Sequence, residues 1–583
     1  MKRMTTIAGL IGVLLIAACA APPSRSTGQT ASGGTERASQ SRGNRAITIG
    51  FSSTVQSMGI MGATTTSGGW QSLNEIHSNG LVTADRNTRK PVPRLAAKLP
   101  SLDDGSITVL PDGRMRVVYA LRSDVTWQDG APFTAQDLTF SYRFNSDYNL
   151  PTAVRRDVLD QIESVEAPDR ATFIIYFKEP YAIGGTLGLR AFWPQPAHIL
   201  GPVYEQFLVR KDADEVLKLA YWTSEYMHLG PFRVTSFDPS ELALAAYDAY
   251  FLGRPRVDVV YLKSFTDQNT MFSNLLAGTV DMFPDIALTS ELGYRLKDIW
   301  ESSGRGAVRV NMGVTWFLAP QWRPSVQTEA ATLDPRVRGA LYRALDREAL
   351  SDALQGGHSE LSAWSLLPPG HQFHDATKDG LRPYAYDADR ARAELRTLGW
   401  TPGDDGVLRN NADGRRFHTA IWATVGRDRE IAAFASFWRL AGIEVEESIV
   451  PASQSRSLEY RAQYPGWESS GQGYGDAILG RMDPPAASAA TRWVGERGGF
   501  EDPRAWDLIA RYRASLSDRD QAQSMRGISD YVAAELPFLI LYYLPDHLGV
   551  RAGVKAFDDT DGGAEAAQPY GTYSRNAHLW EVL

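Results

Sequence analysis

The sequence predicts a multidomain α/β or α+β protein. Segments with strand-like and helix-like patterns mix along the whole chain, as in folds that combine both elements. No internal repeat with a period of about 20 to 50 residues is found, which argues against a solenoid. The chain has 583 residues, of which 43% are hydrophobic and 22% charged, so it is long enough to build several cores.

Four segments have the composition of strands. The first is 46–50, close to the expected start of ordered structure. Residues 106–110 and 114–121 flank 111–113, a Pro-Asp-Gly sequence whose fixed and permissive backbone angles suit a hairpin turn. Residues 172–177 form a further predicted strand.

Three helices are predicted from apolar residues spaced by three and four positions. Asp334 is placed to cap the first, and Pro335 occupies its first helical position. Asp387 precedes the second, which Gly399 can end in a left-handed conformation. Apolar and aromatic residues over 506–516 mark the third.

Charge and cysteine content exclude several classes of function. Lys plus Arg number 60 and Asp plus Glu 68, for a net charge of −8, which leaves no diffuse basic surface to hold nucleic acid. The single cysteine, Cys19, excludes an intramolecular disulfide and thiolate-rich metal sites. The motifs Gly-x-Ser-x-Gly and His-Glu-x-x-His do not occur. These absences remove the commonest nucleophile and zinc-hydrolase signatures, while a catalytic triad assembled from distant residues stays possible.

The N-terminus resembles a bacterial lipoprotein signal peptide. A basic segment, 1–3, precedes the apolar run 7–17, which is too short to span a hydrocarbon layer of about 30 Å. The run ends in small residues before Cys19, which resembles the lipobox, where the thiol receives a diacylglycerol. We expect 1–18 to be removed and Cys19 to be lipidated. An accidental buried cysteine is the alternative.

Residues 19–45 are rich in Ser, Gly, Thr, Gln and Ala and contain no aromatic residue. Such a composition buries too little apolar surface to offset the entropy of ordering, so a disordered tether is predicted. The protein is expected to be exported and lipid-anchored, on the outer face of the cell membrane or in the periplasm.

Eight short motifs resemble those of one protein family. Residues 121–130, continued by 132–140, are similar to a signature of the peptide/nickel family (family 5) of extracellular solute-binding lipoproteins, which serve ABC importers. The other similar motifs come in the family's order: Pro93-Arg94-Leu95-Ala96, Leu229-Gly230-Pro231-Phe232-Arg233, Gly253-Arg254-Pro255-Arg256-Val257-Asp258, Leu276-Ala277-Gly278-Thr279-Val280-Asp281, Asp334-Pro335-Arg336-Val337-Arg338 with Asp346-Arg347, Tyr386-Asp387 with Gly399-Trp400, and Leu536-Pro537.

The resemblance implies a periplasmic-binding-protein-like α/β fold, with two lobes hinged by two connecting strands, a large inserted third lobe and a ligand cleft between lobes. On this sequence it implies lobe I at 46–90, 205–310 and 540–583, lobe II at 91–204 and lobe III at 311–539.

The resemblance also implies a function. It implies a monomeric receptor that captures a small peptide-like solute and delivers it to an ABC permease, with no cofactor, no catalytic residue and no nucleic-acid partner. Alternatives within the same fold are an oligosaccharide, an opine or a metal complex as ligand, or a sensory or chaperone role.

Most signature residues are expected to stabilise the fold rather than to contact ligand. Asp129-Gly130 has the composition of a turn, and Trp127 is expected in a core. Arg336 and Arg338 are expected to form ion pairs across domains, with contact to a transporter as the alternative.

The ligand is expected to bind near 465–476. In peptide-binding members of the family, an aspartate shortly after a Trp pairs with the ammonium of the ligand. Here Ser469 and Ser470 stand where the acid is expected, and Glu468 or Asp476 are the candidate substitutes. Because of this departure, generic short peptides are expected to bind poorly. Glycines at 466, 471, 473 and 475 predict either a ligand-binding loop or a flexible surface loop.

Five tryptophans are further candidates, because flat rings stack on sugars and aromatic compounds. Core packing is the alternative for each of them. The predicted ligand-binding residues are Trp70, Trp316, Trp364, Trp422, Trp467, Glu468, Tyr474 and Asp476.

No metal site is predicted. His371 and His374 are three residues apart, but they lie in a Pro- and Gly-rich string that favours a solvated loop. Residues 558–563 faintly resemble a calcium loop, but counted from Asp559 the twelfth position is Tyr570 instead of Glu. A polar turn is preferred there.

Overall fold

The computed structural model describes residues 45–60, 69–85, 90–150, 152, 155–455, 457–473, 475–556 and 574–583. The predicted signal peptide, Cys19, the tether up to residue 44, Tyr474 and the calcium-like segment lie outside these ranges. In the part of the chain that the structure describes, no helix is long and apolar enough to cross a bilayer.

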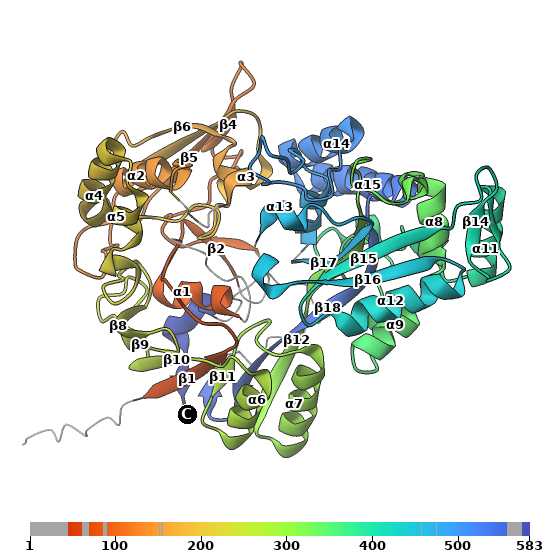
Figure 1. The fold of residues 1–583 in the computed structure, drawn as a ribbon. Helices are drawn as coiled ribbons and strands as arrows, with labels where there is room; N and C mark the ends of the chain where they lie inside the picture. Colours follow the sequence, from red (N-terminus) through yellow and green to blue (C-terminus); the bar gives the residue numbers. More distant parts are fainter. Residues whose placement is uncertain are drawn as a thin grey trace, which may run out of the picture. The chain divides into compact units, whose positions relative to one another are not determined.

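The main feature of the fold is a ten-stranded mixed sheet (Figure 1). The predicted strand 46–50 is confirmed as part of β1, which pairs in parallel with β10. The strands follow one another across the sheet in the order β16 (Glu444–Val450), β15 (His418–Thr424), β17 (Trp467–Gly473), β12 (Gly306–Pro320), β18 (Leu539–Arg551), β11 (Met282–Phe283), β1 (Ala46–Phe51), β10 (Val259–Ser264), β9 (Glu241–Ala246) and β8 (Phe232–Asp238).

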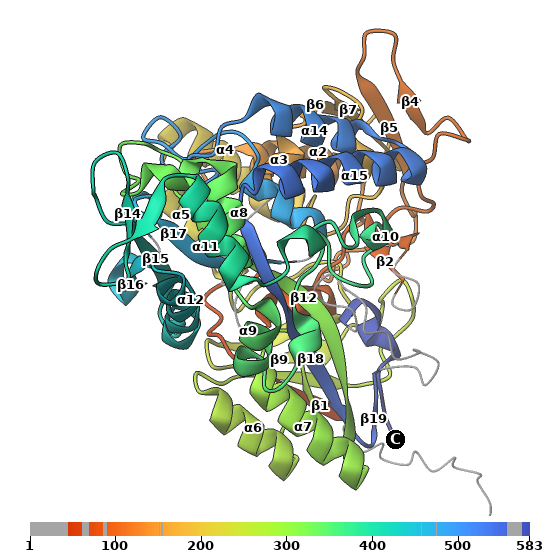
Figure 2. The same ribbon diagram turned by 90° about the vertical axis from the view of Figure 1, so that its right-hand side faces the viewer.

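Two long strands, β12 and β18, join the two ends of this sheet (Figure 2). They pair antiparallel from Gly306 opposite Arg551 to Leu318 opposite Leu539. β18 also pairs with β11 at one end, while β12 pairs with β17 at the other. Both strands are rich in apolar residues that are buried, as expected for strands covered on both faces. The lobe boundaries drawn from the sequence stay a prediction.

A second, antiparallel sheet has the order β4 (Ile107–Val109), β5 (Met115–Ala120), β7 (Thr172–Phe177) and β6 (Ile162–Glu166). The predicted strands and the hairpin turn in this region are confirmed. Trp127 is fully buried in the core that this sheet forms with helix α2 (Ala135–Ser146). Asp129 accepts a hydrogen bond from the Ala131 backbone N–H, which confirms the predicted turn.

The predicted helices are confirmed, with one difference. Asp334 caps α8 (Pro335–Arg343), and Asp387 caps α11 (Ala388–Thr397). Gly399 has φ +88° just beyond α11. The third helix, α14 (Pro503–Ala514), ends before Leu516, because Leu516 packs instead against the core of the second sheet.

The remaining helices cover both sheets and connect their strands (Figure 1). They are α1 (Asn74–His77), α3 (Arg156–Leu159), α4 (Ala197–Arg210), α5 (Ala213–Leu217), α6 (Gln268–Ala277), α7 (Ser290–Ser303), α9 (Arg347–Leu354), α10 (His374–Thr377), α12 (Asp428–Leu440), α13 (Leu458–Arg461) and α15 (Asp518–Glu535).

The expectation that Arg336 and Arg338 form ion pairs across domains is wrong. Arg336 pairs with Asp334, two residues away at the start of its own helix, at 2.6 Å. Arg338 is buried and donates to backbone carbonyls of Thr332 and Leu536, both at 2.9 Å. Both arginines therefore contribute locally: one to the cap of α8 and the other to the packing of the chain before β18.

Candidate functional site

A cavity of about 2150 Å³ is lined by residues from distant parts of the chain. One wall consists of residues between 148 and 191, here called wall A, and the facing wall of residues between 471 and 513, here called wall B. The rest of the lining includes residues within 286–291, 426–430 and 544–546. Typical small-molecule sites measure about 300–1,000 Å³, so this cavity has room for a solute larger than a single amino acid.

The glycine-rich run is a strand and not a loop, which corrects the interpretation of the sequence. Residues 467–473 form β17, paired with β12 on one side and β15 on the other. A Cβ atom on Gly466 would lie 2.4 Å from the carbonyl oxygen of Ala420, and one on Gly471 would lie 2.6 Å from the Trp316 ring. These glycines therefore permit close packing of the protein against itself.

Trp316 forms part of the cavity lining, but its ring is held by protein groups. Its indole N–H donates to Ser469 Oγ at 3.0 Å. The Arg427 guanidinium lies over the ring, 4.3 Å from its centroid, and Gly471 packs against the ring as well. Because only 6% of Trp316 is exposed, the residue shapes the wall more than it offers a surface for stacking.

Glu468 lies in a buried cluster of arginines. Its carboxylate oxygens lie 2.7 Å from Arg461, 3.2 Å from Arg497 and 3.3 Å from Arg481. Burial raises the pKa of Glu468, but the three positive charges outweigh burial, so the net pKa is below its usual value. Arg481 also pairs with Glu496 at 3.3 Å. Glu468 thus has its charge balanced within the protein, next to a small cavity and not in the lining of the large one.

The other four candidate tryptophans are absent from the described lining of the large cavity. Trp70 is buried and stacks on His77, and Trp467 is fully buried against Trp438. The ring of Trp364 has the guanidinium of Arg347 at 4.1 Å and that of Arg382 at 4.2 Å. Trp422 stacks on Tyr460 and lines the small cavity with Glu468. A ligand-binding role for these residues stays a prediction.

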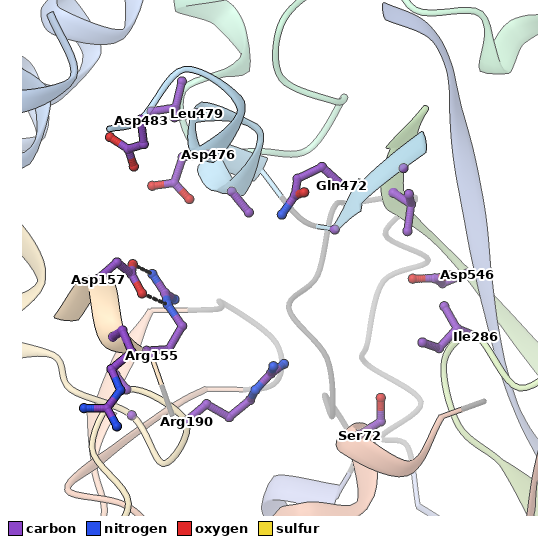
Figure 3. A pocket seen from close by; sticks show the side chains of 18 of the residues that line it. Ser72, Arg155, Asp157, Arg190, Ile286, Gln472, Asp476, Leu479, Asp483 and Asp546 are labelled. Carbon is purple, nitrogen blue, oxygen red and sulfur yellow. Dashed lines mark hydrogen bonds and ion pairs between the residues drawn. The ribbon is translucent and has the colours of Figure 1, made fainter. Parts of the chain in front are cut away.

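One end of the cavity carries ion pairs on both walls. Figure 3 shows the pair of Arg155 and Asp157 on wall A, with Asp483 of wall B across the cavity. On wall A, Arg155 makes two hydrogen bonds to Asp157, at 2.8 and 2.5 Å. On wall B, Arg513 makes two hydrogen bonds to Asp483, one of them 3.0 Å long. Also on wall B, exposed Asp476 accepts a hydrogen bond from the Tyr512 hydroxyl at 3.0 Å. Asp476 is thus a predicted ligand residue that lies in the cavity lining.

The charges of the two walls influence each other's protonation. The pKa of Asp157 is lowered, because Arg155 and, from the facing wall, Arg513 together outweigh the effect of burial. The pKa of Asp483 is raised, mainly by burial, with a contribution from the negative charge of Asp157. Both pairs line the same end of the cavity, on opposite walls.

The two predicted loop histidines do not form a metal site with neighbouring residues. His371 lines the cavity and accepts a hydrogen bond from the Phe373 backbone N–H, while His374 begins the short helix α10. Burial lowers the pKa of His371. Within the described ranges, no group of three or more His, Cys, Asp or Glu side chains is arranged to hold a metal ion.

The cavity charges other than Asp476 were missed by the sequence analysis. Arg155, Asp157, Asp483 and Arg513 lie outside every family motif, and only the folding of the chain brings them together. The sequence did contain a pattern that could have predicted the lining residues 426–430, because a glycine and charged residues follow strand β15 closely. In α/β sheets, ligands bind beyond the carboxyl ends of strands.

The fold and the cavity together define a class: a ligand-binding protein with two long strands, β12 and β18, in its mixed sheet and a large cavity lined by charges of both signs. The family model for bacterial extracellular solute-binding proteins, family 5, matches residues 90–481. The chain belongs to this family, whose members carry ligands and catalyse no reaction, in agreement with the sequence analysis.

Individual relatives are distant but cover most of the chain. Protein XP55 of Streptomyces lividans is 25% identical over 542 residues, which are 92% of this chain and 88% of the relative. The oligopeptide-binding protein of Thermus thermophilus, solved with a pentapeptide, has a TM-score of 0.71 at 19% identity over 92% of this chain and 96% of its own. NikZ of Campylobacter jejuni, solved with Ni(L-His), has a TM-score of 0.69 at 17% identity over 92% of this chain and 99% of its own.

Proposed function

We propose that this chain is the receptor of an ABC importer, which binds a peptide-like solute in the 2150 Å³ cavity and passes it unchanged to a permease. The observation that carries this proposal is the pairing of a large cavity with charges of both signs on facing walls. A solute with a basic and an acidic end and polar groups between them matches such a lining, because charged hydrogen bonds are the strong ones. The similarity to a protein solved with a pentapeptide supports the same class of ligand.

A second candidate is an anionic solute such as an opine or a metal chelate. Eight arginines, no lysine and nine acidic residues occur among the described lining residues, and guanidinium groups can bind the carboxylates of a solute in a bidentate manner. An oligosaccharide has less support, because the Trp316 ring is covered by Arg427 and Gly471.

Mass spectrometry of the solute that co-purifies with the protein from its native host tests the proposal. We expect a non-covalent solute, recovered unchanged after incubation. Repeated failure to find any bound solute, or accumulation of a reaction product, would contradict a carrier role. Comparison of Asp476→Asn with Glu163→Gln, an exposed residue outside the cavity lining, then identifies the part of the cavity that binds the solute. A basic group at Asp476 predicts about tenfold or greater loss of affinity in the first variant only.

Generic peptides provide a further test. We expect unrelated di- to pentapeptides to stabilise the protein weakly, because Ser469 and Ser470 replace the expected acid and Glu468 is neutralised by arginines. A thermal-shift screen in which several unrelated short peptides raise the melting temperature would reject this selectivity and leave the receptor function in place.

We further propose that the mature protein acts outside the cytoplasm as a monomer, held at a membrane by a lipid on Cys19 and a flexible 19–45 tether. The lipobox-like sequence and the exported family support this proposal. A coil of about 25 residues has an end-to-end distance of roughly 25–30 Å, which lets the binding domain reorient toward a permease.

A further inference from the structure

The two walls already touch at the end of the cavity that carries the ion pairs. Helix α14 of wall B contacts the short helix Ala182–Gly185 of wall A. Beyond α14, Leu516 packs against the core of the second sheet, which also includes Tyr181 of wall A. Apolar contact therefore holds together two segments that are more than 300 residues apart in the sequence.

The ion pairs beside this contact retain access to water. Exposed fractions of the side chains are 52% for Arg155 and 41% for Asp157 on wall A, and 31% for Arg513 and 18% for Asp483 on wall B. Each pair is satisfied locally, because each arginine donates hydrogen bonds to the aspartate of its own wall. Each pair also offers a cation and an anion to the other wall, because all four side chains line the cavity.

We propose that these two ion pairs form a four-charge latch across the cavity, in which Asp157 engages Arg513 and Arg155 engages Asp483 as the walls approach. The inference rests on the proposed function, because the latch would close the same cavity. Water leaves the gap as the walls approach, and the attraction between opposite charges then strengthens. The latch thereby raises the population of the closed form and, with it, the apparent affinity for solute.

The experiment tests which wall position carries the positive and which the negative charge of each ion pair. Arg155→Asp with Asp157→Arg keeps the ion pair on wall A but reverses it, so that like charges face each other across the gap. Asp483→Arg with Arg513→Asp does the same on wall B. All four substitutions together restore complementarity. A purely local structural role would tolerate each reversal equally well.

The experiment measures the distance between the walls directly. The full chain with Cys19→Ser carries spin labels at Asp103→Cys and Arg396→Cys, two exposed positions. Pulsed electron paramagnetic resonance gives the distribution of distances between the two labels without added ligand. We expect each two-residue reversal to lower the ratio of closed to open molecules about tenfold, and the four-residue variant to recover it. Reversal of Asp112 and Arg114, an exposed pair with the same spacing outside the cavity, is the matched control.

The salt dependence of the labelled chain tests the latch if a reversed variant does not fold. In the labelled chain with native walls, 1 M salt should move the distribution in the same direction as a reversal, because it screens exposed charges over about 3 Å. Unchanged distributions in salt or in both reversals, or no recovery in the four-residue variant, overturn the latch. Because no ligand is used, such a failure leaves the proposed receptor function intact.

Discussion

Glu468 allows a sharp test, because the sequence and the structure suggest different roles for it. By sequence it is a candidate for the acid that holds a ligand, whereas in the structure it forms ion pairs with three arginines within 3.3 Å. The isosteric change Glu468→Gln removes one negative charge from the cluster and leaves Arg481 paired with Glu496 at 3.3 Å.

The expected cost follows from burial. Glu468 and Arg481 have side chains exposed by 5% and 7%, and removal of one partner from a buried ion pair costs about 3–5 kcal/mol. Glu163→Gln is the matched control: Glu163 pairs with Arg114 at 2.8 Å, but the side chains are exposed by 44% and 38%, and such a pair contributes about 0.2–1 kcal/mol.

The assay is hydrogen exchange detected by mass spectrometry. Exchange of the peptide that covers β17 measures the free energy of local opening of that strand. We expect exchange there to increase at least a hundredfold in Glu468→Gln, since about 1.4 kcal/mol corresponds to a factor of ten, and little in Glu163→Gln. In the native protein, the net pKa of Glu468 is below its usual value. Its contribution to stability is therefore present at neutral pH and is lost as pH falls through that lowered pKa. Unchanged exchange of β17 together with a loss of solute binding would refute the structural role.

Three other substitutions test the packing of Gly471, the burial of His547 and the lipid anchor at Cys19. Gly471→Ala should cost about 1–3 kcal/mol by displacing Trp316, whereas Gly480→Ala, with no atom within 4 Å of the added Cβ, should leave the unfolding free energy nearly unchanged; equal effects would contradict the packing role of Gly471. Burial first, and the charges of His358 and Lys297 second, lower the pKa of His547 to about 3. The unfolded chain therefore binds an additional proton at this residue between pH 6.5 and 3, so His547 should lower stability by about 1.4 kcal/mol per pH unit on acidification, in addition to the contributions of the buried His77, His228 and His578. His547→Gln should flatten that slope by about one proton, and an unchanged slope in urea titrations at several pH values would reject the assignment. Cys19→Ser should release the protein from membranes after a high-salt wash, and continued partition with membranes would disprove the lipid anchor.

Local features were predictable from the sequence. The caps at Asp334 and Asp387 and the left-handed Gly399 depend on neighbours within four residues, so the sequence pattern contains them. The family resemblance predicted two connecting strands, and β12 and β18 join the two ends of the sheet, although no pattern predicted their bounds.

Non-local features were not predictable. Gly471 is a glycine because Trp316, 155 residues earlier in the chain, occupies the space of a side chain, and without that partner the glycine-rich run has the composition of a loop. Likewise, Arg155 and Arg513 become part of one cavity only because α14 lies against wall A. The position of a charged residue in the sequence does not indicate which distant residues will share a cavity with it.

The ladder between β12 and β18 is interrupted next to the cavity. Met312 is opposite Pro545 and Val314 is opposite Leu544, so Gly313 is an additional residue on one strand, and the Asp546 carboxylate fills the space beside it. A bulge of this kind concentrates twist at one position. Paired strands resist separation but permit twisting, so we expect the two ends of the sheet to rotate relative to each other about the bulge at Gly313. The proposed permease would then distinguish the bound from the unbound receptor by the angle between the two ends.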